Sequence, residues 1–141
     1  MTRAASSIFT PAMEADQDSR AAVRAAIATA DAFTARFNAR DLAGMDALLH
    51  FPHVILSAET LIIWDRPGQL PPTFFDDLSA GTGWHHTEYV ERRSVLVCVR
   101  KVHLLVDYTR NRADGTVISR HQNMWTVTRE AGRWGIKQRS Y

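Results

Sequence analysis

The chain has one cysteine, two lysines and no long apolar run, and each scarcity excludes a class of protein. Cys98 has no second cysteine to pair with, so we expect a reduced thiol and a cytoplasmic protein. No stretch approaches the ~18 apolar residues of a membrane span. Residues 1–19 also lack the apolar core of a signal peptide. The sequence therefore predicts a protein without a membrane partner.

Charge of one sign is not concentrated anywhere in the chain. The formal net charge is +2, from 17 basic and 15 acidic residues that are interleaved along the sequence. Nucleic-acid-binding proteins gather positive charge on one face, so we expect no nucleic-acid partner. A P-loop, a nucleophile elbow and a dinucleotide-binding glycine pattern are all missing. His50 and His53 are separated by Pro52 and have no matching ligands, so we predict no metal site and no cofactor.

The apolar pattern predicts one domain over residues 17–141, preceded by a flexible tail over residues 1–16. A helix starts near Asp18 or Ser19 and continues to about Ala39. Its apolar stripe consists of Val23, Ala26, Ile27, Ala30, Phe33, Thr34 and Phe37. Asp41 caps a second, short helix that ends at Pro52, and a third covers about 73–79.

Strands account for most of the remaining chain. Residues 53–57 and 60–64 form a short hairpin, and four long strands cover about 86–99, 101–112, 116–129 and 133–140. A two-residue turn at Asp114-Gly115 fixes the pairing of the middle strands. It places Tyr108 opposite His121, Val106 opposite Asn123, and Leu104 opposite Trp125. The turn at Ala131-Gly132 then pairs Trp125 with Gln138 and Val127 with Ile136.

This register predicts one mostly apolar face that covers the first helix. Its members are Val95, Val97, Leu104, Val106, Tyr108, His121, Asn123, Trp125, Val127, Trp134, Ile136 and Gln138. The expected fold class is α+β: a strongly curved, mainly antiparallel mixed sheet wraps around the long N-terminal helix, with two short helices. Such a sheet encloses a pocket.

The order of these elements resembles that of the nuclear transport factor 2-like superfamily. Three segments carry the resemblance, namely Phe37-Asn38-Ala39-Arg40-Asp41-Leu42, Ala47-Leu48-Leu49 and Gly132-Arg133-Trp134-Gly135-Ile136. The resemblance implies a cone-shaped fold with an internal pocket, and a homodimer packed through the outer face of the sheet. The superfamily includes ketosteroid isomerases, scytalone dehydratases, polyketide cyclases of the SnoaL type and non-enzymatic domains. Fold alone therefore does not decide the function.

Neither of two enzymes of this superfamily has its complete set of catalytic residues in this sequence. The tyrosine, base and neutral acid of ketosteroid isomerase fall at Phe33, Ser57 and Asn123, which cannot perform that reaction. The first histidine of scytalone dehydratase falls at His85 or His86, but residues 108–110 lack the second. The resemblance therefore does not transfer either activity.

Five residues are candidates for acid–base chemistry: His121, His86, His85, Tyr108 and Asn123. A histidine near its ordinary pKa of ~6.5 exchanges protons at neutral pH. The alternative for His121, Tyr108 and Asn123 is a polar trio whose members satisfy one another in the core. The alternative for His85 and His86 is a pair of surface histidines at the start of a strand.

Candidate ligand-binding residues line the expected pocket; they are Phe33, Phe37, Ser57, Trp64, Val106, Trp125 and Gln138. The aromatic members of this set serve equally well as core residues. We therefore consider two functions. The first is a pocket for a small, mostly apolar or cyclic organic ligand, with a cofactor-independent lyase, isomerase or cyclase reaction. The second is a non-catalytic ligand-binding or dimerisation module of the same fold.

Overall fold

A computed structural model describes residues 16–141, with side chains from Ser19 onward. The helices are α1 (Asp16–Asn38), α2 (Leu42–Asp46) and α3 (Phe74–Thr82). The strands are β1 (Leu49–Ser57), β2 (Thr60–Trp64), β3 (His86–Cys98), β4 (Lys101–Asn111), β5 (Val117–Glu130) and β6 (Arg133–Ser140). The predicted tail lies outside the described residues except for Asp16. The first helix begins there, two or three residues before the predicted cap.

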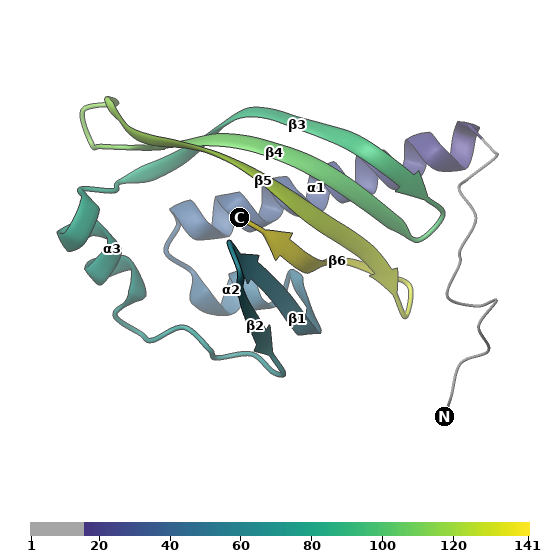
Figure 1. The fold of residues 1–141 in the computed structure, drawn as a ribbon, viewed down its shortest axis with the longest axis horizontal. Coiled ribbons are helices and arrows are strands. Elements are labelled where there is room, and N and C mark those ends of the chain that lie inside the picture. Colours follow the sequence, from purple (N-terminus) through teal and green to yellow (C-terminus); the bar gives the residue numbers. More distant parts are fainter. Residues whose placement is uncertain (1–15) are drawn as a thin grey trace.

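Six strands form one open, curved sheet in the order β2-β1-β6-β5-β4-β3. All neighbours are antiparallel except β1 and β6, which run parallel. Helix α1 lies along one face of this sheet, as Figure 1 shows. In the same view α2 lies beside β1 and β2, and α3 lies near the start of β3. The α+β cone predicted from the sequence is therefore confirmed.

The core lies where the apolar stripe of α1 meets the inner face of the sheet. Ala26, Ala30 and Phe33 are buried against strand residues. The ring of Phe33 packs edge-on against Trp125 at 5.5 Å. Aromatic pairs in this geometry add to the stability gained from burial alone. The packing of Phe33 on Trp125 thus fixes the helix on the inner face of the sheet.

The pairing predicted for β4 and β5 is correct. Tyr108 faces His121, Val106 faces Asn123, and Leu104 faces Trp125. The side chains of Tyr108, Asn123 and Trp125 are all buried on the side of α1. Since side chains alternate across a strand, one correct pair fixes the face of every other residue up to the next irregularity.

The pairing predicted for Gln138 is wrong by one residue. Val127 faces Ile136 as expected, but Lys137 forms a bulge, so Arg139 faces Trp125 and Gln138 faces Thr126. A bulge adds one residue to a strand and inverts the faces beyond it. Gln138 is consequently exposed, and Arg139 is buried in its place.

Two smaller predictions also need correction. Val95 is exposed instead of inward, because the register of β3 shifts between Tyr89 and Glu91 and again between Ser94 and Leu96. The second helix does not extend to Pro52. It ends at Asp46, and Pro52 lies inside β1 after a cis peptide bond. The capping role of Asp41 is confirmed by its side chain, which accepts a hydrogen bond from the Gly44 amide at 2.9 Å.

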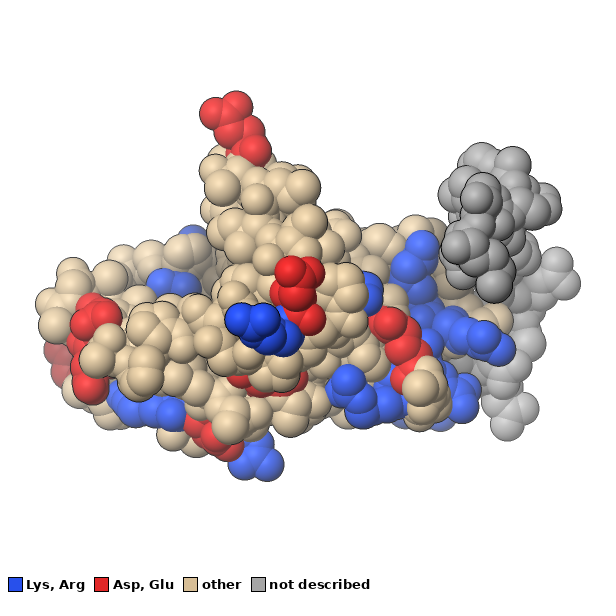
Figure 2. Space-filling model, turned by 90° about the horizontal axis from the view of Figure 1, so that it is seen from below, with Lys and Arg blue, Asp and Glu red and all other residues tan. Residues whose placement is uncertain are grey.

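Charges of both signs are interspersed on the face seen in Figure 2, with uncharged areas between them. Within residues 16–141, no helix combines the length and the apolar character needed to cross a membrane.

Candidate functional site

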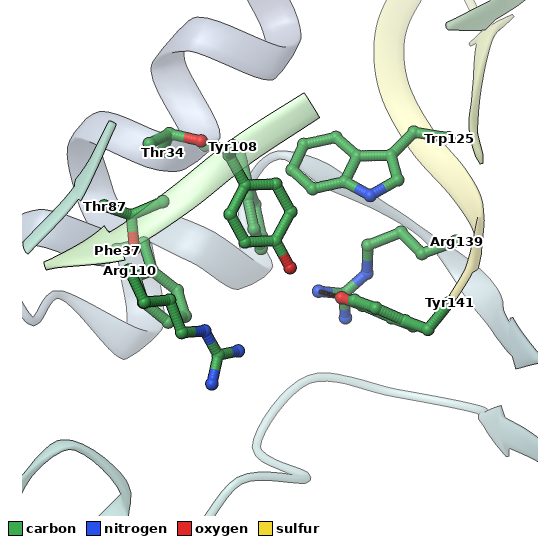
Figure 3. A pocket seen from close by; sticks show the side chains of 9 residues that line it. Thr34, Phe37, Thr87, Tyr108, Arg110, Trp125, Arg139 and Tyr141 are labelled. Atoms are coloured by element: carbon green, nitrogen blue, oxygen red, sulfur yellow. Dashed lines mark hydrogen bonds between the residues drawn. The ribbon is translucent and has the colours of Figure 1, made fainter. Parts of the chain in front are cut away.

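A small cavity of about 40 Å³ lies between α1 and the ends of β4, β5 and β6. Its lining residues are Phe33, Thr34, Phe37, Thr87, Tyr108, Arg110, Trp125, Arg139 and Tyr141. The hydroxyl of Tyr108 and the indole nitrogen of Trp125 point toward the guanidinium of Arg139 and the hydroxyl of Tyr141 (Figure 3). The cavity therefore has an aromatic wall and a polar end.

The bulge at Lys137 brings Arg139 into this cavity. The guanidinium is stacked over the ring of Phe33 at 5.2 Å and over Trp64 at 5.6 Å. It donates from Nε to Nε2 of His53 at 3.0 Å and from Nη1 to the hydroxyl of Tyr141 at 3.0 Å. Only 7% of Arg139 is exposed, so this is a buried positive charge with aromatic contacts.

His53 lies directly behind Arg139 and is fully buried. Its Nδ1 donates to the carbonyl of Ile136 at 3.0 Å, which leaves Nε2 free to accept from Arg139. Burial, followed by the charge of Arg139, lowers the pKa of His53 from 6.5 to about 3. His53 is thus neutral at physiological pH and orients Arg139 without adding a second positive charge.

Tyr108 and Asn123 form a buried pair at the cavity. The amide nitrogen of Asn123 donates to the Tyr108 hydroxyl at 2.9 Å, so the hydroxyl proton remains available to another acceptor. Burial raises the pKa of Tyr108, and the hydrogen bond from Asn123 opposes the shift. Tyr108 is therefore a protonated hydrogen-bond donor in the cavity lining.

His121 lies behind Tyr108 and outside the lining. Its ring stacks on the tyrosine ring at 5.1 Å, and Nε2 is 2.8 Å from the hydroxyl of Ser119. Partial burial, and then the charge of Arg110, lower the pKa of this histidine. His121 is therefore an uncharged base that the ring of Tyr108 separates from the cavity.

His85 and His86 also lie outside the lining. Their Nδ1 atoms are 3.1 Å apart, and Nε2 of His86 is 3.1 Å from a carboxylate oxygen of Glu88. Since Glu88 accepts from Nε2 of His86, Nδ1 of His86 must accept from Nδ1 of His85 when both rings are neutral. The two histidines form a chain on the surface at the start of β3.

Asn38, the last residue of α1, fixes the start of β3 beside the cavity. Its side-chain amide donates to the Thr87 carbonyl at 2.9 Å, and its carbonyl oxygen accepts from the Thr87 amide at 2.8 Å. The hydroxyl of Thr87 accepts from the indole of the buried Trp84 at 3.0 Å. These bonds attach one wall of the cavity to the helix.

The predicted ligand-binding residues separate into three groups. Phe33, Phe37 and Trp125 line the cavity, as does the predicted acid–base residue Tyr108. Trp64 lies behind Arg139, and Val106 is fully buried in the core. Ser57 and Gln138 are exposed on the surface.

Sequence reasoning missed five lining residues, which are Thr34, Thr87, Arg110, Arg139 and Tyr141. The sequence contained one signal for Arg139. Lys137, Gln138 and Arg139 are three consecutive polar residues, which break the alternation expected of a half-buried strand. A bulge at this position was therefore a possible interpretation.

Among residues 16–141, no cluster of three or more histidine, cysteine or acidic side chains is arranged to hold a metal ion. The cavity lining instead provides hydrogen-bond donors, two guanidinium groups and aromatic rings.

Searches against family models and against curated proteins found no match to this chain. Solved structures do match. A protein of unknown function with a cystatin-like fold from Nostoc punctiforme is 12% identical, with a TM-score of 0.66 over 91% of this chain and 92% of that one. A nuclear transport factor 2-like protein of unknown function from Shewanella oneidensis is 10% identical, with a TM-score of 0.59 over 84% and 96%.

A hexachlorocyclohexane dehydrochlorinase from Novosphingobium barchaimii is 17% identical, with a TM-score of 0.59 over 89% of this chain and 88% of that chain. At these identities the similarity is one of fold. The chain has the nuclear transport factor 2-like cone fold, which confirms the resemblance found in the sequence at the level of architecture.

Proposed function

We propose that the chain binds a small cyclic organic molecule in the cavity between α1 and the sheet. The observation that carries this proposal is the composition of the lining, with Phe33, Phe37 and Trp125 on the walls and Tyr108 at the polar end. Apolar walls with a few oriented polar groups are typical of small-molecule sites. Cone-fold proteins that include a dehydrochlorinase and a ketosteroid isomerase-like protein provide further support.

The cavity has to open before it can hold such a molecule. Its volume of about 40 Å³ is enough for a few water molecules, whereas a cavity of ~150 Å³ is needed to hold benzene. Tyr141 is the lining residue best placed to move, because 42% of it is exposed. Its backbone stays anchored, since its amide donates to the Leu56 carbonyl at 2.8 Å. Rotation of one side chain therefore enlarges the site while the sheet stays intact.

Tryptophan fluorescence tests the binding proposal, because Trp125 lines the cavity. We would titrate the protein with a panel of monocyclic aromatic, terpenoid and steroid compounds. A binding compound is expected to change the emission of the wild type and of Trp134→Phe, but much less that of Trp125→Phe. If no compound changes the emission or the melting temperature, the proposal is wrong.

A second candidate is a cofactor-independent lyase, isomerase or cyclase reaction. The observation that favours it is the contact between the neutral His121 and Tyr108, whose hydroxyl reaches the cavity with support from Asn123. In this proposal Tyr108 donates a hydrogen bond to a substrate oxygen. After a local rearrangement, His121 removes a proton from the substrate and returns it to another substrate atom or to the leaving group. His85 and His86 have no lining contact, so they take part only if the start of β3 moves.

Turnover of the compounds that bind tests this second candidate. General acid–base catalysis contributes about 10²–10⁴-fold, so His121→Gln should reduce any turnover by that factor. His103→Gln is the matched control, because His103 lies on the outer face and bonds to Thr126. Equal turnover in the two variants would assign His121 to packing.

We also propose that two copies associate through the outer face of the sheet. Leu96 on β3 is 48% exposed on this face, opposite His103. Leu105 and Met124 face each other on the neighbouring strands and are half-buried. Exposed apolar side chains on a sheet face indicate an interaction surface.

A further inference from the structure

Arg139 has far more hydrogen-bonding capacity than the protein uses. A guanidinium carries five N–H donors. One donates to His53 and one to Tyr141, so three have no hydrogen-bond partner within residues 16–141. The side chain is nevertheless 93% buried, from an exposed fraction of 7%. A buried cation is costly unless it is paired, so an unused fork of donors at a cavity indicates a missing acceptor.

No carboxylate fills this role in the described part of the chain. The ion pairs found there join other residues, and none involves Arg139. Its partner His53 is neutral, and its other contacts are aromatic rings. The positive charge is thus oriented and largely buried, but no ion pair neutralises it among the described residues.

Two other lining residues also lack acceptors. The indole nitrogen of Trp125 and Nε of Arg110 are both buried without a hydrogen-bond partner among the described residues. Both residues line the same cavity as Arg139, and the indole nitrogen points toward the guanidinium (Figure 3). The great majority of buried polar groups in proteins are paired, so two unpartnered donor atoms beside the unpaired guanidinium of Arg139 are informative.

We propose that this cavity binds an organic acid, with the carboxylate on Arg139 and Trp125 and the ring against Phe33 and Phe37. This inference rests on the proposed function and specifies the ligand class. A planar carboxylate matches the fork of a guanidinium, which gives two parallel, charge-assisted hydrogen bonds. Arg110, on the opposite side of the cavity, adds a second positive charge that favours an anion.

The half-exposed Tyr141 occupies the acceptor position on Arg139 in this structure. Its hydroxyl takes the Nη1–H of Arg139 at 3.0 Å. A carboxylate is a stronger acceptor of this bond than a neutral hydroxyl. The ligand therefore displaces the Tyr141 side chain outward, and the same movement opens the cavity to the size of a ring.

Benzoate and benzamide provide the test, because they have the same shape and differ in charge. At matched ionic strength, calorimetric titration of the full chain should give benzoate a dissociation constant at least about tenfold lower than that of benzamide. Phenylphosphonate and benzenesulfonate are included to distinguish a carboxylate site from a general anion site. Tighter binding of either of these would overturn the assignment to a carboxylate.

Three variants connect this preference to the cavity. Arg139→Gln should abolish the preference for benzoate, and Arg110→Gln should reduce it several-fold. Arg100→Gln should leave it unchanged, because Arg100 is exposed in the β3–β4 turn. If Arg139→Gln does not fold, as judged by circular dichroism, Arg139→Lys replaces it. This variant keeps the charge but loses the planar fork of donors, so it should bind benzoate several-fold more weakly than the wild type.

The outcomes separate the two proposals. If benzamide binds less than about tenfold more weakly than benzoate, or if Arg139→Gln (Arg139→Lys where Arg139→Gln does not fold) and Arg110→Gln both bind benzoate as tightly as the wild type does, the anion site is wrong while the binding function stands. If neither these four compounds nor the wider panel binds, both proposals fail.

Discussion

The Nε–H of Arg139 donates to Nε2 of His53 at 3.0 Å, although both side chains can carry a positive charge. The bond requires a neutral imidazole, and the second bond from Nδ1 to the Ile136 carbonyl fixes which nitrogen carries the proton. His53 is thereby a structural support for the guanidinium of Arg139 in the cavity lining. This role gives the fold a specific sensitivity to acid.

Acid should destabilise the protein through His53. Its pKa is about 3 in the folded protein and ~6.5 in the unfolded chain, so between these values the unfolded state binds more protons. Stability is therefore fully present above pH ~6.5 and is lost as the pH falls toward 3. At pH 5 the loss from this residue is about 2 kcal/mol relative to neutral pH.

Urea denaturation at pH 7 and pH 5 measures this effect. In His53→Gln the amide can replace both hydrogen bonds but does not titrate. The stability difference between the two pH values should be about 2 kcal/mol smaller in the variant than in the wild type. Identical differences would mean that His53 is accessible to protons in the folded state.

Gly135 should not tolerate a side chain. A Cβ at this position would lie 2.9 Å from two atoms of the His50 ring. That ring cannot move away, because Nε2 is 3.0 Å from the carbonyls of Thr128 and Arg133, and Arg133 donates to Nδ1 at 3.0 Å. We expect Gly135→Ala to reduce the free energy of unfolding by about 1–3 kcal/mol.

Gly81→Ala is the control for this substitution. Gly81 lies within α3, and a Cβ there would meet no atom within 4 Å. Alanine is favoured over glycine inside a helix, so this variant should gain roughly 0.5–1 kcal/mol. Thermal melts of both variants check the contrast, and a stable Gly135→Ala would show that His50 is not held in place.

The outer sheet face should control the oligomeric state. We expect light scattering of the wild type to give twice the chain mass of 15.9 kDa. Leu96→Glu places a charge within the proposed interface and should give a folded monomer, since Leu96 is exposed in the single chain. Ile63→Glu, on the edge strand β2, is the control with a similar exposure. A monomer produced by the control alone would place the interface at β2.

The sequence was most informative where apolar and polar residues alternate without interruption. From Leu104 to Tyr108 and from His121 to Trp125 the alternation and the turn between them determine register and face, and the structure agrees. The prediction failed beyond Ile136 and at Val95, where an extra residue shifts the faces. Bulges depend on packing against the whole sheet, so local alternation does not reveal them.

The same limit applies to the candidate site. Phe33, Phe37, Tyr108 and Trp125 were expected at the pocket because they lie on regular elements. Arg139 was not expected, because its inward direction results from the bulge and its neutral partner His53 lies on a neighbouring strand that is distant in sequence. The polar end of the cavity is thus a tertiary property, whereas its apolar wall follows from periodicity.

The Asn38 side chain should hold the start of β3 against α1. Its removal should be detectable at one backbone amide, that of Thr87. Both of its side-chain hydrogen bonds go to the backbone of Thr87, at 2.8 and 2.9 Å. Asn38→Ala leaves the Thr87 amide and carbonyl without these partners, at a cost of about 1–3 kcal/mol. Asn38→Asp keeps the acceptor for the Thr87 amide but turns a carboxylate oxygen toward the Thr87 carbonyl, so it should also destabilise the protein at pH 7.

Hydrogen exchange distinguishes the local effect of these two hydrogen bonds from a general loss of stability. In Asn38→Ala the Thr87 amide should exchange faster by a larger factor than amides in the middle of β4 and β5. Ser57→Ala is the control, because Ser57 is exposed at the end of β1 and should leave the Thr87 amide protected. An equal increase at every amide of Asn38→Ala would mean that the whole domain opens as one unit. Selective exchange at Thr87 would instead make the start of β3 a locally stabilised segment, which α1 holds in place beside the cavity.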